Sequence, residues 1–378
     1  MYCGLVLAEM TQPPKSILVI SLRYFGDVLL TTPLIRALAR GYDGAAIDVL
    51  LTEATGEILE GNPDVRNILT VAPRPSLAGH AALVRRLWRR YDLAVIAETG
   101  DRPHLYGFLA APRRVGLVPP EPLARWWKAP LLSHSVAFAR EQQRIDGYGR
   151  LARAMALPFA AEAIAPTAGT SASAWRGRLG FDADRDAYAV LNLAPRFRYK
   201  RWHMRGWCSL LEWLHARGLR IVVSGGKAAE ERDYAREVLA ESTVPAIELV
   251  GRLRFGETAD LLRGAALYIG PDTATSHLAA ACGTPAVVLF GPTDPRLWGP
   301  LPRGGLDSPY TQVAAAQHRR NVLLLQEPSL SCVPCQREGC ERHRESFSAC
   351  LDALSAANVI AAAQALLGPT QSGASPRA

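Results

Sequence analysis

Three segments contain residue types suited to binding phosphate, and the densest of them lies between Tyr268 and Ala281. A strand-like run ends there, and one carboxylate and three hydroxyl side chains precede an Ala-rich helical pattern. The first N–H groups of a helix lack intrahelical partners and carry partial positive charge, so this position suits an anion. Helix capping alone needs fewer such residues, and we therefore interpret the segment as a ligand site. Its residues are Asp272, Thr273, Ala274, Thr275, Ser276 and His277.

The second segment is a glycine pair, Gly225-Gly226, that follows another strand-like run and precedes Glu231 in a helical pattern. Paired glycines let a ligand approach the backbone closely, but tight turns use them equally often, so this signal is weak by itself. Lys200 lies in a loop after a third such run. A lone lysine there is normally a solvated charge, whereas beside a phosphate site it would stabilise a leaving phosphate.

The third segment is Arg23-Tyr24-Phe25-Gly26-Asp27, directly after the first strand-like run. Asp27 at a helix start is usually an N-cap, yet a carboxylate at the carboxyl end of a strand also stands where a general base would act. Both interpretations stay open from the residues alone. None of the three segments is a GxGxxG or Walker sequence, so a dehydrogenase or a P-loop NTPase loses its main support.

The spacing Cys332-x2-Cys335-x4-Cys340-x9-Cys350 would allow four thiolates to bind zinc. The second CxxC pair of a usual zinc ribbon is missing, so we favour metal-free thiols and expect neither a metal nor a cofactor. Arg125-Trp126-Trp127-Lys128 places two indoles between cations. Such a patch could rest at lipid headgroups, although a Trp pair in the core is commoner for so short a segment.

Short apolar runs alternate with helical patterns such as Val28–Arg40, and the series occurs twice. This pattern predicts an α/β protein with two doubly wound, parallel-sheet domains. We place the domains at 1–175 and 176–351, because residues 157–186 have no sustained period, and expect a helix at 352–367 that packs back on the first domain. The tail, 368–378, is expected to be disordered. The predicted strands are Ile17–Leu22, Ile47–Thr52, Asn67–Val71, Leu93–Ala97, Ala187–Leu193, Leu219–Gly226, Ala246–Gly251, Ala266–Gly270 and Ala286–Gly291.

The formal charge of +8 is uneven, because residues 1–180 carry 21 Lys and Arg against 15 Asp and Glu. A basic half suits an anionic partner such as a phosphorylated glycolipid or a membrane surface, and no nucleic-acid module is present. Plain solubility explains the charge equally well. No apolar run is long enough for a transmembrane helix, and the start does not resemble a signal peptide. We therefore expect a cytoplasmic protein, with peripheral contact at the inner membrane as an open alternative.

Taken together, these segments resemble glycosyltransferase family 9, the bacterial heptosyltransferases. The family's DTGxxHxAAAxxxPxxxLFGPTxP stretch corresponds to Asp272–Pro295 here, and its R-x-x-GD-x-L segment to Arg23–Leu29. The similarity covers roughly residues 15–367. Within the family, the opening segment, residues 47–65 and Trp298-Gly299-Pro300 resemble the heptosyltransferase III subgroup.

The resemblance implies a GT-B fold with two facing Rossmann-like domains, the first for the acceptor and the second for the donor. It implies an inverting enzyme that transfers heptose from ADP-L-glycero-D-manno-heptose to a lipopolysaccharide inner-core sugar, without a metal. Asp27 then matches the general base, and Lys200 and Thr273–Ser276 match the diphosphate site. Asp272 and His277 would line that site, with Glu231 near the ribose and Arg23 near an anionic group of the acceptor.

Two departures leave alternatives open. Ala274 replaces the family's usual glycine, and residues 194–199 lack its common His-Pro-Gly. A transferase that uses another nucleotide sugar for a surface glycan is therefore the nearest alternative. A nucleotide-sugar epimerase or hydrolase, and a non-catalytic binding protein, share the two-domain architecture.

Overall fold

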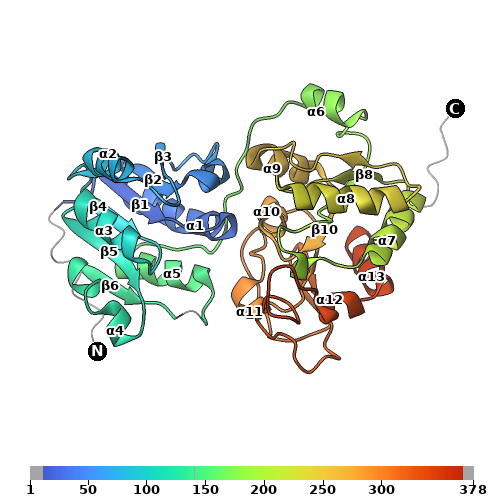
Figure 1. Ribbon diagram of the computed structural model, residues 1–378. Coiled ribbons are helices and arrows are strands. Elements are labelled where there is room, and N and C mark those ends of the chain that lie inside the picture. The colour runs from blue at the N-terminus through green and yellow to red at the C-terminus, as the bar shows by residue number, and fades with distance from the viewer. Residues whose placement is uncertain (1–11, 140, 369–378) are drawn as a thin grey trace. The chain divides into compact units, whose positions relative to one another are not determined.

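The computed structural model describes residues 12–139 and 141–368. The chain divides into two compact units, Met1–Pro166 and Thr167–Ala378 (Figure 1). The division lies within the segment expected to lack a sustained period, which also contains the short helix α6, and the predicted boundary after residue 175 lies inside that helix. The predicted tail beyond Gly368 lies outside the described residues.

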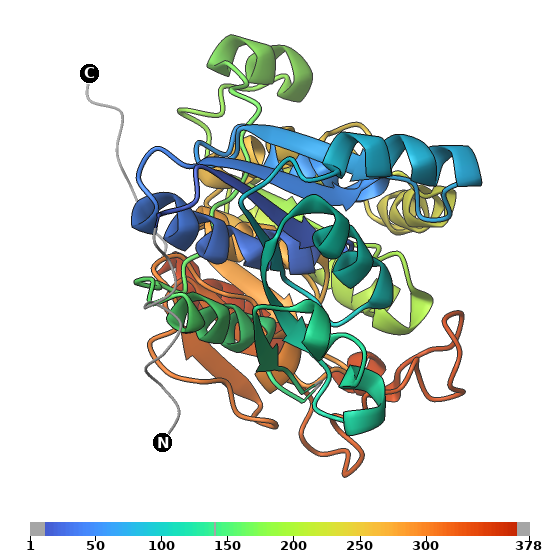
Figure 2. The same cartoon turned by 90° about the vertical axis from the view of Figure 1, so that its left-hand side faces the viewer.

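The first unit is built on a six-stranded parallel sheet in the order β3-β2-β1-β4-β5-β6. Ile17–Ile20 of β1 are completely buried, as expected for a strand covered on both faces. Helices α1 and α5 pack together on one face, and α2 and α3 cover the other (Figures 1 and 2). The elements are β1 (Ser16–Ser21), α1 (Phe25–Gly41), β2 (Ala46–Thr52), η2 (Glu53–Leu59), β3 (Asn67–Val71), α2 (Leu77–Leu87), β4 (Leu93–Ile96), α3 (Asp101–Ala110), β5 (Arg113–Val118), α4 (Pro122–Arg125), η3 (Ala129–Leu131), β6 (His134–Ala137) and α5 (Arg144–Ala154).

The second unit contains a seven-stranded sheet in the order β12-β13-β11-β10-β7-β8-β9, in which only the pair β12 and β13 is antiparallel. Its elements are α6 (Ala172–Leu179), β7 (Tyr188–Leu191), η4 (Arg198–Lys200), α7 (Met204–Ala216), β8 (Arg220–Val223), α8 (Ala229–Glu241), β9 (Ile247–Glu248), α9 (Phe255–Gly264), β10 (Leu267–Pro271), α10 (Ala274–Cys282), β11 (Ala286–Leu289), α11 (Pro295–Trp298), β12 (Ala316–Arg319), β13 (Val322–Leu325), α12 (Ala349–Ala353) and α13 (Ala356–Leu367). The fold class predicted from the sequence, α/β with two parallel sheets, is confirmed.

The predicted terminal helix at 352–367 is divided at Leu354 into α12 and α13. The contacts that α13 makes with α7, β10, β11 and β13 lie within the second unit. The fully buried Trp202 anchors the junction between α12 and α13, because its indole Nε1 donates a 2.8 Å hydrogen bond to the carbonyl of Leu354. The described helices include none that is long and apolar enough to span a membrane.

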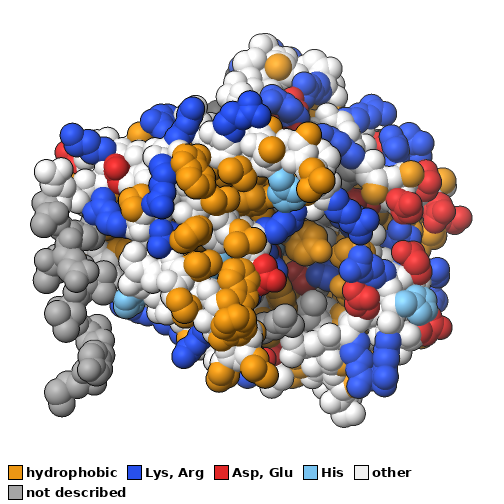
Figure 3. All heavy atoms as spheres, turned by 60° about the vertical axis from the view of Figure 1, so that its left-hand side comes forward, with side chains coloured by type: hydrophobic (Ala, Val, Ile, Leu, Met, Phe, Trp, Pro, Cys, Tyr) orange, Lys and Arg blue, Asp and Glu red, His pale blue; other side chains and the backbone are white. Residues whose placement is uncertain are grey.

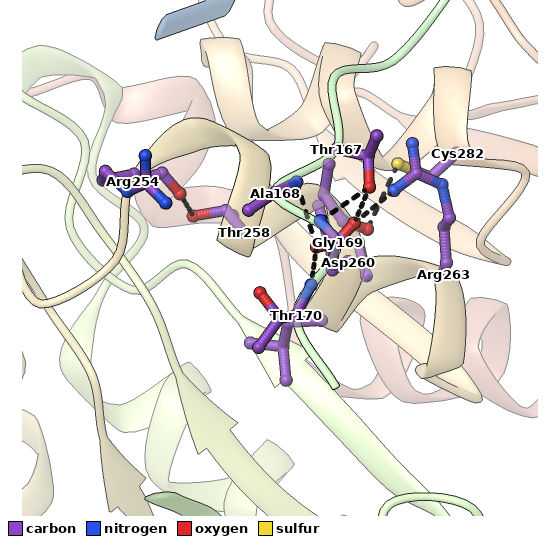
Figure 4. Close-up of polar contacts among 12 residues, drawn as sticks. Thr167, Ala168, Gly169, Thr170, Arg254, Thr258, Asp260, Arg263 and Cys282 are labelled. Carbon is purple, nitrogen blue, oxygen red and sulfur yellow. Dashed lines mark hydrogen bonds and ion pairs between the residues drawn. The ribbon is translucent and has the colours of Figure 1, made fainter. Parts of the chain in front are cut away.

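The chain enters the second unit through a segment that is tied to α9 by one carboxylate (Figure 4). Asp260 accepts hydrogen bonds from Thr167 Oγ1 at 2.7 Å, from the N–H of Ala168 at 3.1 Å and from the N–H of Thr170 at 3.0 Å. Arg263 pairs with the same carboxylate at 2.7 Å. Burial raises the pKa of Asp260, but these hydrogen bonds and the Arg263 charge outweigh it and lower the pKa below its ordinary value.

Replacement of this carboxylate is expected to destabilise the second unit. Asp260→Ala should lower the free energy of unfolding by about 2 kcal/mol, because it removes charge-assisted hydrogen bonds to two backbone N–H groups. Since the folded-state pKa is depressed, the contribution is fully present above the unfolded-state pKa of about 4 and is lost as the pH falls through the folded-state value. Urea unfolding between acidic and neutral pH measures both effects. Asp307→Ala, at an exposed carboxylate that accepts a hydrogen bond from the adjacent Ser308 N–H, is the control and should change stability by less than about 0.5 kcal/mol. An equal loss at every pH would contradict this account.

Candidate active site

The second unit brings Lys200 and Asp272 together at the carboxyl end of β10. Lys200 Nζ lies 2.7 Å from Asp272 Oδ2 and donates to the Asp272 carbonyl at 3.0 Å. Thr293 Oγ1 donates to the same carboxylate oxygen at 2.9 Å. Asp272 is buried, and Lys200 retains partial exposure. The two residues are 72 positions apart in the chain, so the topology of the sheet creates this pair.

Helix α10 begins beside this ion pair, at Ala274. Its N-cap residue is Thr273, whose side chain makes no capping hydrogen bond, so simple capping does not explain the hydroxyl cluster. Ser276 is fully buried, and its hydroxyl donates to the Pro271 carbonyl at 2.5 Å and contacts the Tyr268 hydroxyl at 2.9 Å. The Ser276 side chain therefore fixes the helix to β10, and the start of α10 can meet an anion through backbone N–H groups.

Polar groups follow two neighbouring strands at the same edge of the sheet. Asn192 follows β7, and its Nδ2 donates to Thr273 Oγ1 at 3.3 Å. Ser224 follows β8. Asn192 Oδ1 and Ser224 Oγ are buried and have no hydrogen-bond partner among the described residues. Because buried polar atoms are normally hydrogen-bonded, both atoms are suited to a ligand or water. Asn192 was not among the residues selected from the sequence, although its place at a strand end was a signal.

The side chain of Glu231 packs against the glycine pair that follows β8. The Gly226 N–H donates to Glu231 Oε2 at 2.6 Å, and a Cβ added at Gly226 would lie 2.7 Å from the carboxylate oxygens. A side chain at position 226 would therefore displace the Glu231 carboxylate from its present position. Burial raises the pKa of Glu231, while the Gly226 N–H and the charges of Arg196 and Arg201 act in the opposite direction.

In the first unit, Asp27 lies in the first turn of α1 and does not cap it, because the N-cap residue is Tyr24. The N-cap interpretation is therefore wrong. The buried carboxylate instead joins two arginines: Arg23 Nε lies 3.3 Å from Oδ2, and Arg144 Nε lies 3.2 Å from Oδ1. Arg144 begins α5, which packs against α1.

Two further groups of this site were not selected from the sequence. Glu98 follows β4 and accepts a hydrogen bond from the Leu22 N–H. Its burial raises its pKa, against the lowering effects of the Leu22 N–H, Arg23 and Arg144. Tyr148 is fully buried, and its hydroxyl has no hydrogen-bond partner among the described residues. The strand-end position of Glu98 was a usable signal, whereas Arg144 and Tyr148 are brought in by helix packing alone.

The predicted cysteine cluster has different surroundings from a metal site. No group of three or more His, Cys, Asp or Glu side chains within 12–139 and 141–368 is arranged to hold a metal ion. Cys350 is buried, which raises the pKa of its thiol to about 12, and Cys332 and Cys340 are exposed. The zinc alternative therefore gains no support from the arrangement of these residues.

The chain matches known glycosyltransferases in sequence. Residues 80–306 match the family described as glycosyltransferase family 9 (heptosyltransferase). Lipopolysaccharide heptosyltransferase 3 of Escherichia coli is 28% identical over 294 residues, which cover 74% of this chain and 84% of that protein. Lipopolysaccharide heptosyltransferase 1 of Pseudomonas aeruginosa is 29% identical over 300 residues, covering 75% of this chain and 80% of the relative.

Solved structures share the fold. The family 9 glycosyltransferase of Veillonella parvula aligns with a TM-score of 0.75 at 20% identity, covering 93% of this chain and 97% of that one. E. coli ADP-heptose lipopolysaccharide heptosyltransferase II aligns at 0.70 and 20% identity, with 93% and 98% covered. E. coli heptosyltransferase WaaC with ADP aligns at 0.66 and 21% identity, with 93% and 99% covered. The chain is therefore a glycosyltransferase, and it belongs to glycosyltransferase family 9, the heptosyltransferases.

Proposed function

We propose that this enzyme transfers a heptose, with inversion at the anomeric carbon, from ADP-L-glycero-D-manno-heptose to an inner-core sugar of lipopolysaccharide. The observation that carries the proposal is the Lys200–Asp272 pair at the start of α10. A cation beside a helix N-terminus is suited to stabilise a departing diphosphate. The ADP bound by the relative WaaC supports adenosine diphosphate as the nucleotide of the donor. The similarity to heptosyltransferase 3 supports the assignment to the heptosyltransferase III subgroup.

On the donor side, the diphosphate lies against the N–H groups at the start of α10, while Lys200 neutralises the charge that develops as the sugar leaves. Asp272 holds the Lys200 ammonium in place through its 2.7 Å contact, and Asp272 and His277 line the site. Gly225 and Gly226 bring the backbone close to the nucleotide, and Glu231 contacts its ribose. No metal ion takes part in this proposal.

On the acceptor side, Asp27 takes the proton from the attacking hydroxyl as that oxygen bonds to the anomeric carbon. In the structure Arg23 and Arg144 both bind the Asp27 carboxylate. A phosphate or carboxylate on the acceptor would compete for these arginines, because paired arginines bind such groups strongly. Acceptor binding would then expose Asp27 as the base at the time it is needed. The inner-core acceptor is lipid-anchored, which places the reaction at the cytoplasmic face of the inner membrane.

Loss of Arg144 should act mainly on the acceptor. Arg144→Leu is expected to raise the KM for the acceptor by about tenfold and to reduce kcat less, because it removes an acceptor-binding cation but leaves the Asp27 carboxylate present. Steady-state kinetics with the acceptor varied measure the split. Arg153→Leu, at an exposed position of the same helix, is the control and should match the wild type. An unchanged acceptor KM would remove this role.

A nucleotide-binding screen tests the proposed donor. Purified protein is heated with ADP, UDP, GDP or CMP, and the shift in Tm is compared, because a ligand that binds the folded state raises its stability. A selective increase with ADP is expected. Selectivity for UDP or GDP would replace the heptose donor with another nucleotide sugar while leaving the glycosyltransferase assignment in place.

A further inference from the structure

Large hydrophobic side chains are exposed on the side of the first unit that carries α2, α3 and α4. Leu123 is 90% exposed and Trp126 is 71% exposed, so the interpretation of Trp126 as a core residue is wrong. Figure 3 shows hydrophobic side chains gathered beside Lys and Arg side chains on the face that comes forward. We call this surface the Trp–Arg face; it consists of Trp88, Leu105, Phe108, Leu123 and Trp126 with Arg89, Arg114 and Arg125.

A backbone hydrogen bond joins the end of α2 to α3. The Arg89 N–H donates to the carbonyl of Leu109, which places Trp88 and Arg89 beside the end of α3. Leu105 and Phe108 are one turn apart on the solvent side of α3. The Arg114 guanidinium lies over the Phe108 ring, 5.1 Å from its centroid, so the cation and the aromatic ring occupy the same patch.

A second set of contacts holds the α4 segment against α3. Lys128 Nζ pairs with Asp101 at 2.8 Å, and the Trp127 ring meets the buried His104 ring edge-on with centroids 6.5 Å apart. Arg114 also donates to the carbonyls of Ala111 and Leu131. Trp127 and Lys128 thus act as the anchor of this segment, while Leu123 and Trp126 remain at the solvent surface.

The charge of the region is strongly one-sided. Residues 77–128 contain nine Lys and Arg and four Asp and Glu. Asp92 is engaged by the backbone N–H groups of Lys15 and Ser16, and Glu98 is buried. The remaining acids are Asp101, which is paired with Lys128, and Glu121. A partner for this surface must therefore be anionic and must also accept indole, phenyl and leucine side chains.

We propose that the Trp–Arg face rests on an anionic lipid surface, with Leu123 and Trp126 at the level of the headgroups and the surrounding arginines on lipid phosphates. Indole side chains favour the boundary between apolar and aqueous phases, and each cation near an anionic membrane adds to the attraction. This inference extends the proposed function by assigning a surface to membrane contact, and it rests on that function only for the identity of the membrane.

Vesicle sedimentation of the full chain tests the inference. The protein should bind phosphatidylcholine vesicles that contain phosphatidylglycerol, bind pure phosphatidylcholine much less, and dissociate as salt is added. The double variant Leu123→Ser/Trp126→Ser should lower the partition coefficient by at least about tenfold, because both inserting side chains are lost. Phe347→Ser, at a half-exposed aromatic residue of the second unit, is the control and should remain within about twofold of the wild type.

Two results would overturn the inference: no binding to the anionic vesicles at low salt, or equal binding by the double variant and the wild type. Size-exclusion chromatography adds a third, because dimerisation that the double variant abolishes would assign the face to a second copy of the chain. The Tm shift with ADP is measured on the same samples. Vesicle binding without an increase in Tm with ADP would contradict only the proposed function. An increase in Tm with ADP without vesicle binding would contradict only the membrane contact.

Discussion

The Asp27→Asn enzyme is expected to lose about a thousandfold in kcat for heptose transfer, because an amide cannot accept the proton of the attacking hydroxyl. Affinity for ADP should stay nearly unchanged, since the residues proposed for nucleotide binding belong to the second unit. The substitution is nearly isosteric and keeps an oxygen for Arg23 or Arg144, so the local packing is retained. The measurements are ADP release under saturating substrates and a nucleotide titration.

Asp146 offers a matched control for this prediction. It is an exposed carboxylate in the first turn of α5, as Asp27 is a buried one in the first turn of α1. Asp146→Asn should turn over at a rate within about twofold of the wild type, because it touches no proposed reacting group. If Asp27→Asn retained wild-type kcat, the general base would have to be another group, and the buried Glu98 would be the first to examine.

Lys200→Ala should weaken donor binding by about tenfold and lower kcat by about a further hundredfold, because the ammonium meets the diphosphate both before and during its departure. Among the described residues, the same change leaves the buried Asp272 carboxylate with the Thr293 hydroxyl as its remaining side-chain hydrogen-bond partner, so the protein should also be less stable. Isothermal titration with ADP and steady-state kinetics measure the two functional losses. Arg198→Ala, in the same short helix η4 but exposed, is the control.

A double variant separates the chemical role of Lys200 from its structural role. Lys200→Ala/Asp272→Asn removes the unpaired buried charge, so its Tm should recover toward that of the wild type. Its kcat should stay low, because the cation that stabilises the leaving diphosphate is still absent. Recovery of kcat together with Tm would show that Lys200 serves only to pair with Asp272.

The central strands of both sheets could be predicted from sequence because they are buried on both faces. Ile17–Leu22 and Ala286–Gly291 are continuous apolar runs, and the structure has β1 and β11 there. Four of the described strands were missed. β5 begins with two arginines, and β6 and β12 are short edge strands that contain polar residues. β13 is the buried apolar run Val-Leu-Leu-Leu, and it was missed because a run of four residues is a weak strand signal by itself. Edge and short strands depend on their neighbours more than on their own apolar pattern.

In the candidate site too, some residues could be selected from the sequence, whereas the contacts between them could not. Asp272 could be selected because it directly follows a strand, and Lys200 because it lies in the loop region after β7. Their contact depends on strand order, with β7 next to β10. Arg144 lies 117 positions after Asp27 and meets it only because α5 packs on α1. Such a partner has no signal in a single sequence. The N-cap alternative for Asp27 could be decided only by the backbone, which places the cap at Tyr24.

The most direct test of the account is a transfer assay with ADP-L-glycero-D-manno-heptose and a heptose-deficient lipopolysaccharide inner core, run with a chelator present. ADP release and the mass of the acceptor are followed together. We expect one ADP to be released for each acceptor molecule that gains one heptose residue, with the opposite anomeric configuration in the new bond. ADP release without a change in the mass of the acceptor would indicate hydrolysis and would contradict the proposed transfer. Transfer from a uridine or guanosine diphosphate sugar, with ADP-heptose left intact, would also contradict it.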